Sequence, residues 1–380
     1  MLDYLPLRKR LGDSSWTKNY KYGCVDKSLL SKYVLKPYWD YMIKFIPYNV
    51  APNMVTMWGL LCSSLPSIVI LSYVFFEKTV PRFWFLLSAV GIFAYQTLDN
   101  LDGRQARRLK ASSCLGEITD HCVDSLTSTL YGATTLLAIG VNYQLLVPLL
   151  LFPQIAFFMC IIEESYTGFL YLGVVNAPTE GLIMMAFLNI GGFFGLKISS
   201  PSQEFFLFMF VFAFSAFTLL FSFVNVFLVT RKQFSLFVRC LYEFFVRIIG
   251  FGLIVLLYVC VEHSLVNVFL LLFFSLFFSS IQVLDCLVSV VSKTRMVNSI
   301  VLPVVFVTTL ASVGVVLFNS FTTLLLSLLL GFMVIRFVSF AVDVVRLFSE
   351  DLGIFFLRLT PDQMDYALAL KTNGGAVPEK

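Results

Sequence analysis

Four aspartates lie close together in a chain that is otherwise very apolar. Asp99 and Asp102 are three residues apart and Asp120 and Asp124 are four apart, so on helices each pair would share one face. The first pair ends one apolar run and the second opens another, which would bring the four carboxylates to one depth of a bilayer. Unpaired like charges cannot share an apolar site, and carboxylate oxygens are the ligands that Mg²⁺ and Mn²⁺ prefer. The spacing therefore predicts a divalent metal site.

The residues between these aspartates suit a phosphate group. Gly103 and Gly116 permit a phosphate to approach the backbone closely, and Ala106 places only a small side chain next to Arg107. Arg107 carries a planar guanidinium that can contact a phosphate through two hydrogen bonds. The alternative interpretation is a solvated acidic loop between two helices. The spacing favours a site for metal and phosphate.

The whole pattern, D-x2-D-G-x2-A-R-x8-G-x3-D-x3-D, resembles that of the CDP-alcohol phosphotransferase family, or CDP-alcohol phosphatidyltransferase class I. Its fixed positions are matched without deviation in spacing by Asp99, Asp102, Gly103, Ala106, Arg107, Gly116, Asp120 and Asp124. Eight fixed residues at fixed offsets arise by chance at roughly 10⁻⁷ in such a chain, so the match is specific. The resemblance is to the eukaryotic choline/ethanolamine phosphotransferase branch and is strongest from Tyr20 to Leu182.

The resemblance implies two divalent ions, Mg²⁺ or Mn²⁺, at this site. Asp99 and Asp120 would bridge the ions, Asp102 would complete the shell of one ion, and Asp124 that of the other. Paired ions would polarise a phosphoanhydride and stabilise the departing phosphate oxygen.

The resemblance also implies how a cytidine nucleotide would bind. Arg107 would hold its phosphates, with room provided by Gly103, Ala106 and Gly116. The run APNMVTMWGL resembles the PNxxT start of the first span in the family, where the matching asparagine contacts the nucleotide. This implies the same role for Asn53, for which a plain helix cap is the alternative.

His121, which directly follows Asp120, is the expected general base. Forming a phosphodiester requires a deprotonated acceptor hydroxyl, and histidine titrates in the useful range. In the eukaryotic branch that the chain resembles, a histidine at this position has that role. Glu117, four residues earlier, lies on the same helix face and can fix the tautomer of the ring. Two alternatives remain: Asp124 as the base, and a histidine merely packed between helices.

The composition indicates a membrane protein. Of 380 residues, 58% are hydrophobic and only 13% are charged, with a mean hydropathy of +0.86, whereas soluble chains carry about 25% charged residues. The net charge of +4 is too small to indicate nucleic acid as a partner. The N-terminus is polar and lacks the apolar core of a signal peptide. The eight cysteines have no metal-binding spacing, so free thiols are expected.

The expected fold class is an all-α polytopic membrane protein. About ten transmembrane helices should follow an N-terminal amphipathic helix, Leu29 to Ile46, that lies in the membrane interface. The apolar runs lie near residues 55–76, 83–98, 119–140, 143–162, 180–196, 204–230, 244–261, 264–291, 297–318 and 320–345. Within these runs, Asp285 and Asp343 are predicted to be functional acids or to bond between helices. His263 is expected in a surface turn.

Lys and Arg cluster in one set of inter-span segments, which by the positive-inside rule places both termini and the aspartates on the cytosolic side. Four parts are expected: residues 1–48, a cytosolic arm and the interfacial helix; 49–230, a catalytic core of about six spans; 231–347, a four-span packing and dimer region; and 348–380, a cytosolic tail. A homodimer, and residence in the endoplasmic reticulum or Golgi, are implied by the resemblance alone.

The activity implied by the resemblance is transfer of phosphocholine or phosphoethanolamine from CDP-choline or CDP-ethanolamine to diacylglycerol or alkyl-acylglycerol. The products would be CMP and phosphatidylcholine or phosphatidylethanolamine, and the lipid acceptor would enter sideways from the bilayer. Another CDP-alcohol phosphotransferase, such as a phosphatidylinositol synthase, would carry the same aspartates, although such chains resemble shorter, six-span proteins. A polytopic transporter is the alternative from another class, but it should show broken helices or internal repeats, and the sequence contains neither.

Overall fold

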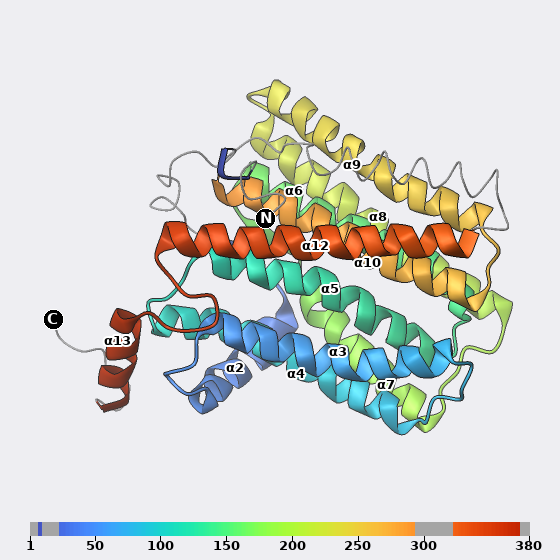
Figure 1. The fold of residues 1–380 in the computed structure, drawn as a ribbon, viewed down its shortest axis with the longest axis horizontal. Coiled ribbons are helices and arrows are strands. Elements are labelled where there is room, and N and C mark those ends of the chain that lie inside the picture. Colours follow the sequence, from blue (N-terminus) through green and yellow to red (C-terminus); the bar gives the residue numbers. More distant parts are fainter. Residues whose placement is uncertain (1–6, 10–22, 293–321, 373–380) are drawn as a thin grey trace.

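The computed structural model describes residues 7–9, 23–292 and 322–372, and long helices lying side by side make up most of it (Figure 1). In chain order they are α3 (Pro52–Phe75), α4 (Phe83–Arg108), α5 (Cys114–Ala138), α6 (Leu146–Thr167), α7 (Leu182–Phe194), α8 (Pro201–Thr230), α9 (Phe234–Cys260), α10 (Leu265–Ser292) and α12 (Thr322–Leu352). Within these ranges, seven helical segments are long and apolar enough to cross a membrane: Pro52–Phe75, Tyr143–Thr167, Ala177–Phe194, Pro201–Thr230, Phe234–Cys260, Leu265–Ser292 and Thr322–Leu352. The predicted helical, polytopic membrane architecture is confirmed.

These seven helices coincide with seven of the predicted apolar runs. The runs near 83–98 and 119–140 belong instead to α4 and α5, which continue from the apolar stretch into the aspartate motif. The run near 297–318 lies outside the described residues, so the total of about ten spans stays a prediction. None of the eight cysteines, all of which lie in the described parts of the chain, forms a disulfide bond, in agreement with the expected thiols.

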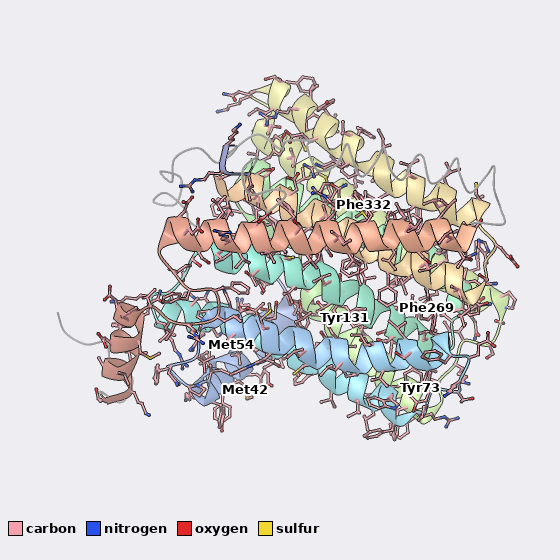
Figure 2. All side chains as sticks on the ribbon, viewed as in Figure 1. Met42, Met54, Tyr73, Tyr131, Phe269 and Phe332 are labelled. Atoms are coloured by element: carbon pink, nitrogen blue, oxygen red, sulfur yellow. The ribbon has the colours of Figure 1, made fainter. Side chains whose placement is uncertain are left out.

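The central helix of the bundle is α5. It packs against α3, α4 and α7, which lie below it in Figure 1, and against α6 and α10. Side chains fill the spaces between the helices, and two that are labelled in Figure 2, Tyr131 of α5 and Phe269 of α10, are buried. The helix that carries half of the aspartate motif is therefore enclosed by its neighbours along its length.

Helices α3 and α4 approach each other closely because of Gly91. A Cβ atom on Gly91 would lie 2.3 Å from the backbone oxygen of Cys62, so no larger residue fits there without moving backbone. The close approach lets α3 and α4 pack side by side, and near the start of α3 the hydroxyl of Thr56 contacts Asp102 of α4.

The amphipathic segment before the first span is helical, as predicted. It comprises α2 (Lys36–Met42), extended at both ends by the short helical turns Ser31–Leu35 and Ile43–Phe45. Trp39 of α2 is buried against Val55 and Leu101, and the guanidinium of Arg104 lies 5.1 Å from its ring centroid. The apolar face of α2 thus packs on the end of α4, while its position in a membrane interface stays a prediction.

A short two-stranded sheet was not predicted. Strand β1 (Cys24–Asp26) pairs in parallel with β2 (Leu170–Leu172), and next to the sheet the hydroxyl of Ser28 donates a hydrogen bond to Glu180. Three-residue strands leave no periodicity that a sequence pattern can reveal. The pairing ties the segment before α2 to the linker that follows α6.

The predicted tail folds back on the bundle. Helix α13 (Pro361–Thr372) contributes Ala367 and Leu370 to a buried cluster that includes Ala51, before α3, and Leu109, after α4. Figure 1 shows α13 at the end of the bundle where α4 ends and α5 begins. The helix therefore covers the loop between the two halves of the aspartate motif.

A buried ion pair accounts for one of the intramembrane acids. The Arg247 Nη2 atom lies 2.5 Å from Oδ2 of Asp285, and Nη1 donates a hydrogen bond of 2.9 Å to Gln282. Both charged side chains are fully buried, so α9 and α10 are joined by a charge-assisted bond inside the bundle. Asp343 is also buried, on α12. His263 lies in the turn between α9 and α10, as expected, with its ring stacked on Tyr258.

Removing one member of the buried pair should destabilise the protein strongly. Asp285→Ala leaves the Arg247 charge without its carboxylate, which typically costs about 3–5 kcal/mol, whereas Arg247→Met with Asp285→Leu removes both charges and should cost much less. Thermal unfolding in detergent measures both variants, with Glu350→Gln, from the exposed pair Arg346–Glu350, as a control of little effect. A double variant as unstable as Asp285→Ala would contradict this explanation.

Candidate active site

The four aspartates converge where α4 ends and α5 begins. The connecting loop turns sharply, with Lys110 in the left-handed region at φ 52°, and Ser113 caps α5 by accepting a hydrogen bond from the backbone N–H of Gly116. The carboxyl groups of Asp99 and Asp120 come close enough to share a hydrogen bond. Those of Asp102 and Asp124 are near enough for their charges to act on Asp120. The structure thus brings together all four carboxylates that the sequence singled out.

Neighbouring helices hold these carboxylates in place. Asp102 is buried and accepts a hydrogen bond from the hydroxyl of Thr56 on α3, and Asp124 accepts one from the hydroxyl of Tyr95 on α4. The Oδ1 atom of Asp120 is buried and has no hydrogen-bond partner among the described residues. A buried acceptor without a donor is expensive unless a cation satisfies it. The donor set, four carboxylates with an unused buried oxygen, fits Mg²⁺ or Mn²⁺.

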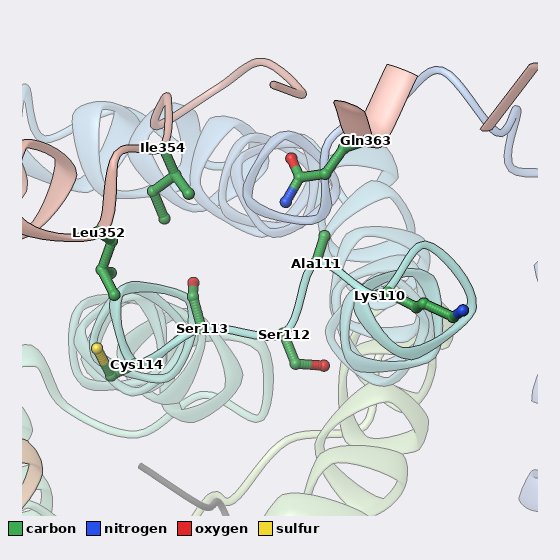
Figure 3. Close-up of a pocket in the computed structure, with 8 residues that line it drawn as sticks. All are labelled: Lys110, Ala111, Ser112, Ser113, Cys114, Leu352, Ile354 and Gln363. Carbon is green, nitrogen blue, oxygen red and sulfur yellow. The ribbon is translucent and has the colours of Figure 1, made fainter. Parts of the chain in front are cut away.

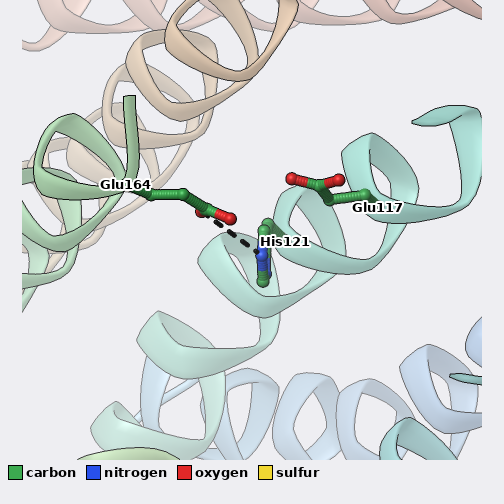
Figure 4. A group of neighbouring side chains, drawn as sticks. All are labelled: Glu117, His121 and Glu164. Atoms are coloured by element: carbon green, nitrogen blue, oxygen red, sulfur yellow. Dashed lines mark ion pairs between the residues drawn. The ribbon is translucent and has the colours of Figure 1, made fainter. Parts of the chain in front are cut away.

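His121 lies between two groups of carboxylates. Its Nδ1 atom is 3.3 Å from Oδ2 of Asp124, and its Nε2 atom is 4.0 Å from Oε2 of Glu164, near the end of α6. The ring is only 4% exposed. At Nδ1 the orienting contact comes from Asp124, while Glu117 lies next to Glu164, as Figure 4 shows. With the proton on Nδ1 donated to Asp124, Nε2 carries the lone pair and can accept a proton.

The residues expected to bind the nucleotide lie around the same helix ends. Arg107 is exposed, and its Nη1 atom would be 3.4 Å from a Cβ atom on Gly103. Asn53 is buried, and its Oδ1 atom would be 3.6 Å from a Cβ on Gly116. The N-cap of α3 is Ala51, so the side chain of Asn53 does not cap the helix. Asn53 and Arg107 thus lie next to Gly116 and Gly103, the two glycines of the aspartate motif.

Ala106 closes the end of α4. It is half-buried, and its carbonyl accepts the backbone N–H of Ala111 at 2.8 Å, which terminates the helix just before the loop. The small side chain leaves the adjacent Arg107 free of a bulky neighbour on this turn of the helix.

A cavity lies beside the loop, under the C-terminal segment. Its volume is about 250 Å³, and Figure 3 shows the residues that line it: Lys110, Ala111, Ser112, Ser113, Cys114, Leu352, Ile354 and Gln363. The ammonium of Lys110 lies 4.6 Å from the ring centroid of Tyr366 on α13. The loop that joins the two aspartate pairs is therefore held from outside by the segment after α12.

Three residues of the site, Thr56, Tyr95 and Glu164, were not predicted from the sequence. Thr56 is the threonine of the PNxxT run, and Tyr95 precedes Asp99 by one helical turn, so both carried a local signal. Glu164 lies near the end of α6, in a stretch (residues 162–182) without Lys or Arg, and its proximity to His121 depends on the packing of α6 against α5.

Comparison with known proteins gives a consistent result. Residues 49–230 match the family described as CDP-alcohol phosphatidyltransferase. The chain is 39% identical over 169 residues to "Uncharacterized CDP-alcohol phosphatidyltransferase class-I family protein 3" of Dictyostelium discoideum, covering 44% of this chain and 42% of that protein. It is 35% identical to Cholinephosphotransferase 1 of Saccharomyces cerevisiae, over 46% of this chain and 45% of the relative. It is 37% identical to Choline/ethanolaminephosphotransferase 2 of Arabidopsis thaliana, over 47% and 45%.

The matched region spans less than half the length of each of these relatives. It contains the four aspartates, His121 and Glu164, together with α3 and α4, which support them. Residues 49–230 of the chain are therefore similar to the CDP-alcohol phosphatidyltransferase family.

Proposed function

We propose that this integral membrane protein transfers phosphocholine or phosphoethanolamine from CDP-choline or CDP-ethanolamine to diacylglycerol or alkyl-acylglycerol, releasing CMP. The observation that carries the proposal is the convergence of four carboxylates with a buried histidine at one end of the bundle. The names of the yeast and Arabidopsis relatives support choline and ethanolamine as head groups. A different CDP-alcohol phosphotransferase, such as a phosphatidylinositol synthase, is the second candidate, because the same aspartates would serve it.

Asp99, Asp102, Asp120 and Asp124 would hold two Mg²⁺ or Mn²⁺ ions. Bound there, such ions neutralise phosphate oxygens and stabilise the leaving group. Arg107, exposed beside Gly103, would contact the phosphates of the nucleotide, and Gly116 would leave space for the nucleotide next to Asn53. These residues bind and orient the donor substrate.

His121 would remove the proton from the acceptor hydroxyl. The proton moves to Nε2, the hydroxyl oxygen forms a bond to the phosphorus that carries the head group, and the phosphoanhydride bond breaks to release CMP. Asp124 keeps the other ring proton on Nδ1, and the carboxylate of Glu164, 4.0 Å from Nε2, stabilises the imidazolium that forms. Asp124 as the base is the alternative that the experiments below distinguish.

The proposal also includes the organisation of the chain into two regions, its orientation in the membrane and its location in the cell. Residues 49–230 would form the catalytic core and 231–347 the packing and dimer region, with the site facing the cytosol in the endoplasmic reticulum or Golgi. The basic residues of the α4–α5 region, including Arg107 and Lys110, favour that orientation.

The proposed activity is tested with purified protein in detergent, diacylglycerol and Mg²⁺. Radiolabelled CDP-choline and CDP-ethanolamine are supplied in parallel, and labelled lipid from either donor supports the proposal. If neither donor gives a lipid product but a CDP-activated lipid and inositol do, the result would support the second candidate, a phosphatidylinositol synthase. Absence of CMP release in every combination would contradict a phosphotransferase.

His121→Ala should lower kcat by about 10²–10⁴-fold, because the hydroxyl then loses its base. The assay above measures the loss, with Glu163→Gln as the control. Glu163 is also buried near the end of α6, but its carboxylate accepts a hydrogen bond of 2.7 Å from Asn225, outside the site. Full activity in His121→Ala would assign the base to Asp124.

Mg²⁺ should stabilise the folded protein, because it binds carboxylates that repel one another when no cation is bound. At a concentration one hundred times the dissociation constant, binding adds about 2.7 kcal/mol to the free energy of unfolding. Thermal unfolding before and after chelation measures this shift, which should be lost in Asp120→Asn. An equal shift in Asp120→Asn would show that Mg²⁺ binds elsewhere.

A further inference from the structure

A second cluster of metal-binding groups lies on the side of the His121 ring that faces away from Asp124. Glu117 and His121, one helical turn apart on α5, meet Glu164 from α6 (Figure 4). One ligand atom from each residue lies within 4.8 Å of the other two. This cluster, the Glu117–His121–Glu164 triad, shares only His121 with the aspartate site.

The triad contains carboxylate oxygens that the protein itself does not satisfy. Glu164 is 3% exposed and points its Oε2 atom toward Nε2 of His121. That oxygen, and Oε2 of Glu117, are buried and accept no hydrogen bond within the described parts of the chain. The two carboxylates also act on each other as like charges. A cation bound between the two glutamates and the imidazole of His121 would satisfy both of these oxygens and relieve the repulsion between the carboxylates.

The types of ligand indicate which cation fits. Mg²⁺ prefers oxygen ligands throughout, whereas Zn²⁺ readily takes imidazole nitrogen with carboxylates and is commonly bound by three protein ligands and water. Tetrahedral ligands 2.0–2.1 Å from Zn²⁺ lie about 3.4 Å apart, so these atoms must approach by up to about 1.4 Å. Rotations of the two glutamate side chains supply movements of that size.

We propose that Glu117, His121 and Glu164 form a Zn²⁺ site, distinct from the Mg²⁺ site of the aspartates, and that Zn²⁺ bound there inhibits the protein. Zn²⁺ on Nε2 occupies the lone pair that would otherwise accept the hydroxyl proton. Metal binding follows from the triad alone, while inhibition rests on the function proposed above. The triad is thus a site at which a second kind of metal controls the base.

Binding is tested without any measurement of activity. Co²⁺, which replaces Zn²⁺ and absorbs visible light when tetrahedrally bound, is titrated into the detergent-purified protein saturated with Mg²⁺. The wild type should gain one equivalent of absorbing Co²⁺ that Zn²⁺ displaces, and Glu164→Gln and Glu117→Gln should lose it. Glu163→Gln, one residue away and bonded to Asn225, should retain it.

Two outcomes of this titration would overturn the site. One is the absence of a tetrahedral Co²⁺ spectrum in the wild type. The other is a spectrum that survives in Glu164→Gln but disappears in Asp99→Asn, which would place the ion among the aspartates. Correct folding of each variant is checked by its thermal unfolding and elution from size exclusion.

Inhibition is tested at saturating Mg²⁺ with increasing Zn²⁺, each variant being compared with its own rate in the absence of Zn²⁺. Glu164→Gln should require at least about tenfold more Zn²⁺ for half inhibition, which corresponds to about 1.4 kcal/mol of lost binding. An unchanged Zn²⁺ requirement would contradict control through the triad. If the wild type makes no lipid from either donor yet binds Co²⁺, the proposed function fails and the metal site stands.

Discussion

The mutual repulsion of four carboxylates is the constraint on which this structure depends. Asp99 and Asp120, both partly buried at one end of the helical bundle, lie close enough to share a hydrogen bond. Such an arrangement persists only when the surrounding structure fixes it, and here each supporting element has a specific contact. The α3 hydroxyl of Thr56 and the α4 hydroxyl of Tyr95 hold two of the carboxylates, and α5 is enclosed on several sides. The bundle serves to keep these charges together until a cation binds.

The imidazole of His121 connects two electrostatic environments. On one side is Asp124, which belongs to the aspartate site, and on the other is Glu164, contributed by a helix that the aspartate motif does not include. A histidine placed between carboxylates has a defined tautomer and a stabilised cationic form, which is the requirement for a base buried from solvent. The fit between α5 and α6 therefore matters as much to the chemistry as the motif itself.

The sequence was informative wherever the determinants were local. The i,i+3 and i,i+4 spacing of the aspartates placed them on helix faces, and apolar runs located the spans, because helix periodicity depends only on near neighbours. Glu164, the pairing of β1 with β2 and the docking of α13 were missed for a common reason. Each depends on segments far apart in the chain, and such contacts leave no local pattern. The Asn53 side chain shows the same limit: a cap and a site residue look identical in sequence, but Ala51 occupies the cap position.

The docking of α13 has a consequence for how the protein is made. The loop between α4 and α5 is inserted early in synthesis, whereas the helix that covers it leaves the ribosome only after α6 to α12 have been translated. During that interval the cluster around Leu109 lacks Ala367 and Leu370, so apolar surface at this end of the bundle is open to chaperones and proteases. The loop between the two aspartate pairs is thus covered only after the chain has been translated through α13.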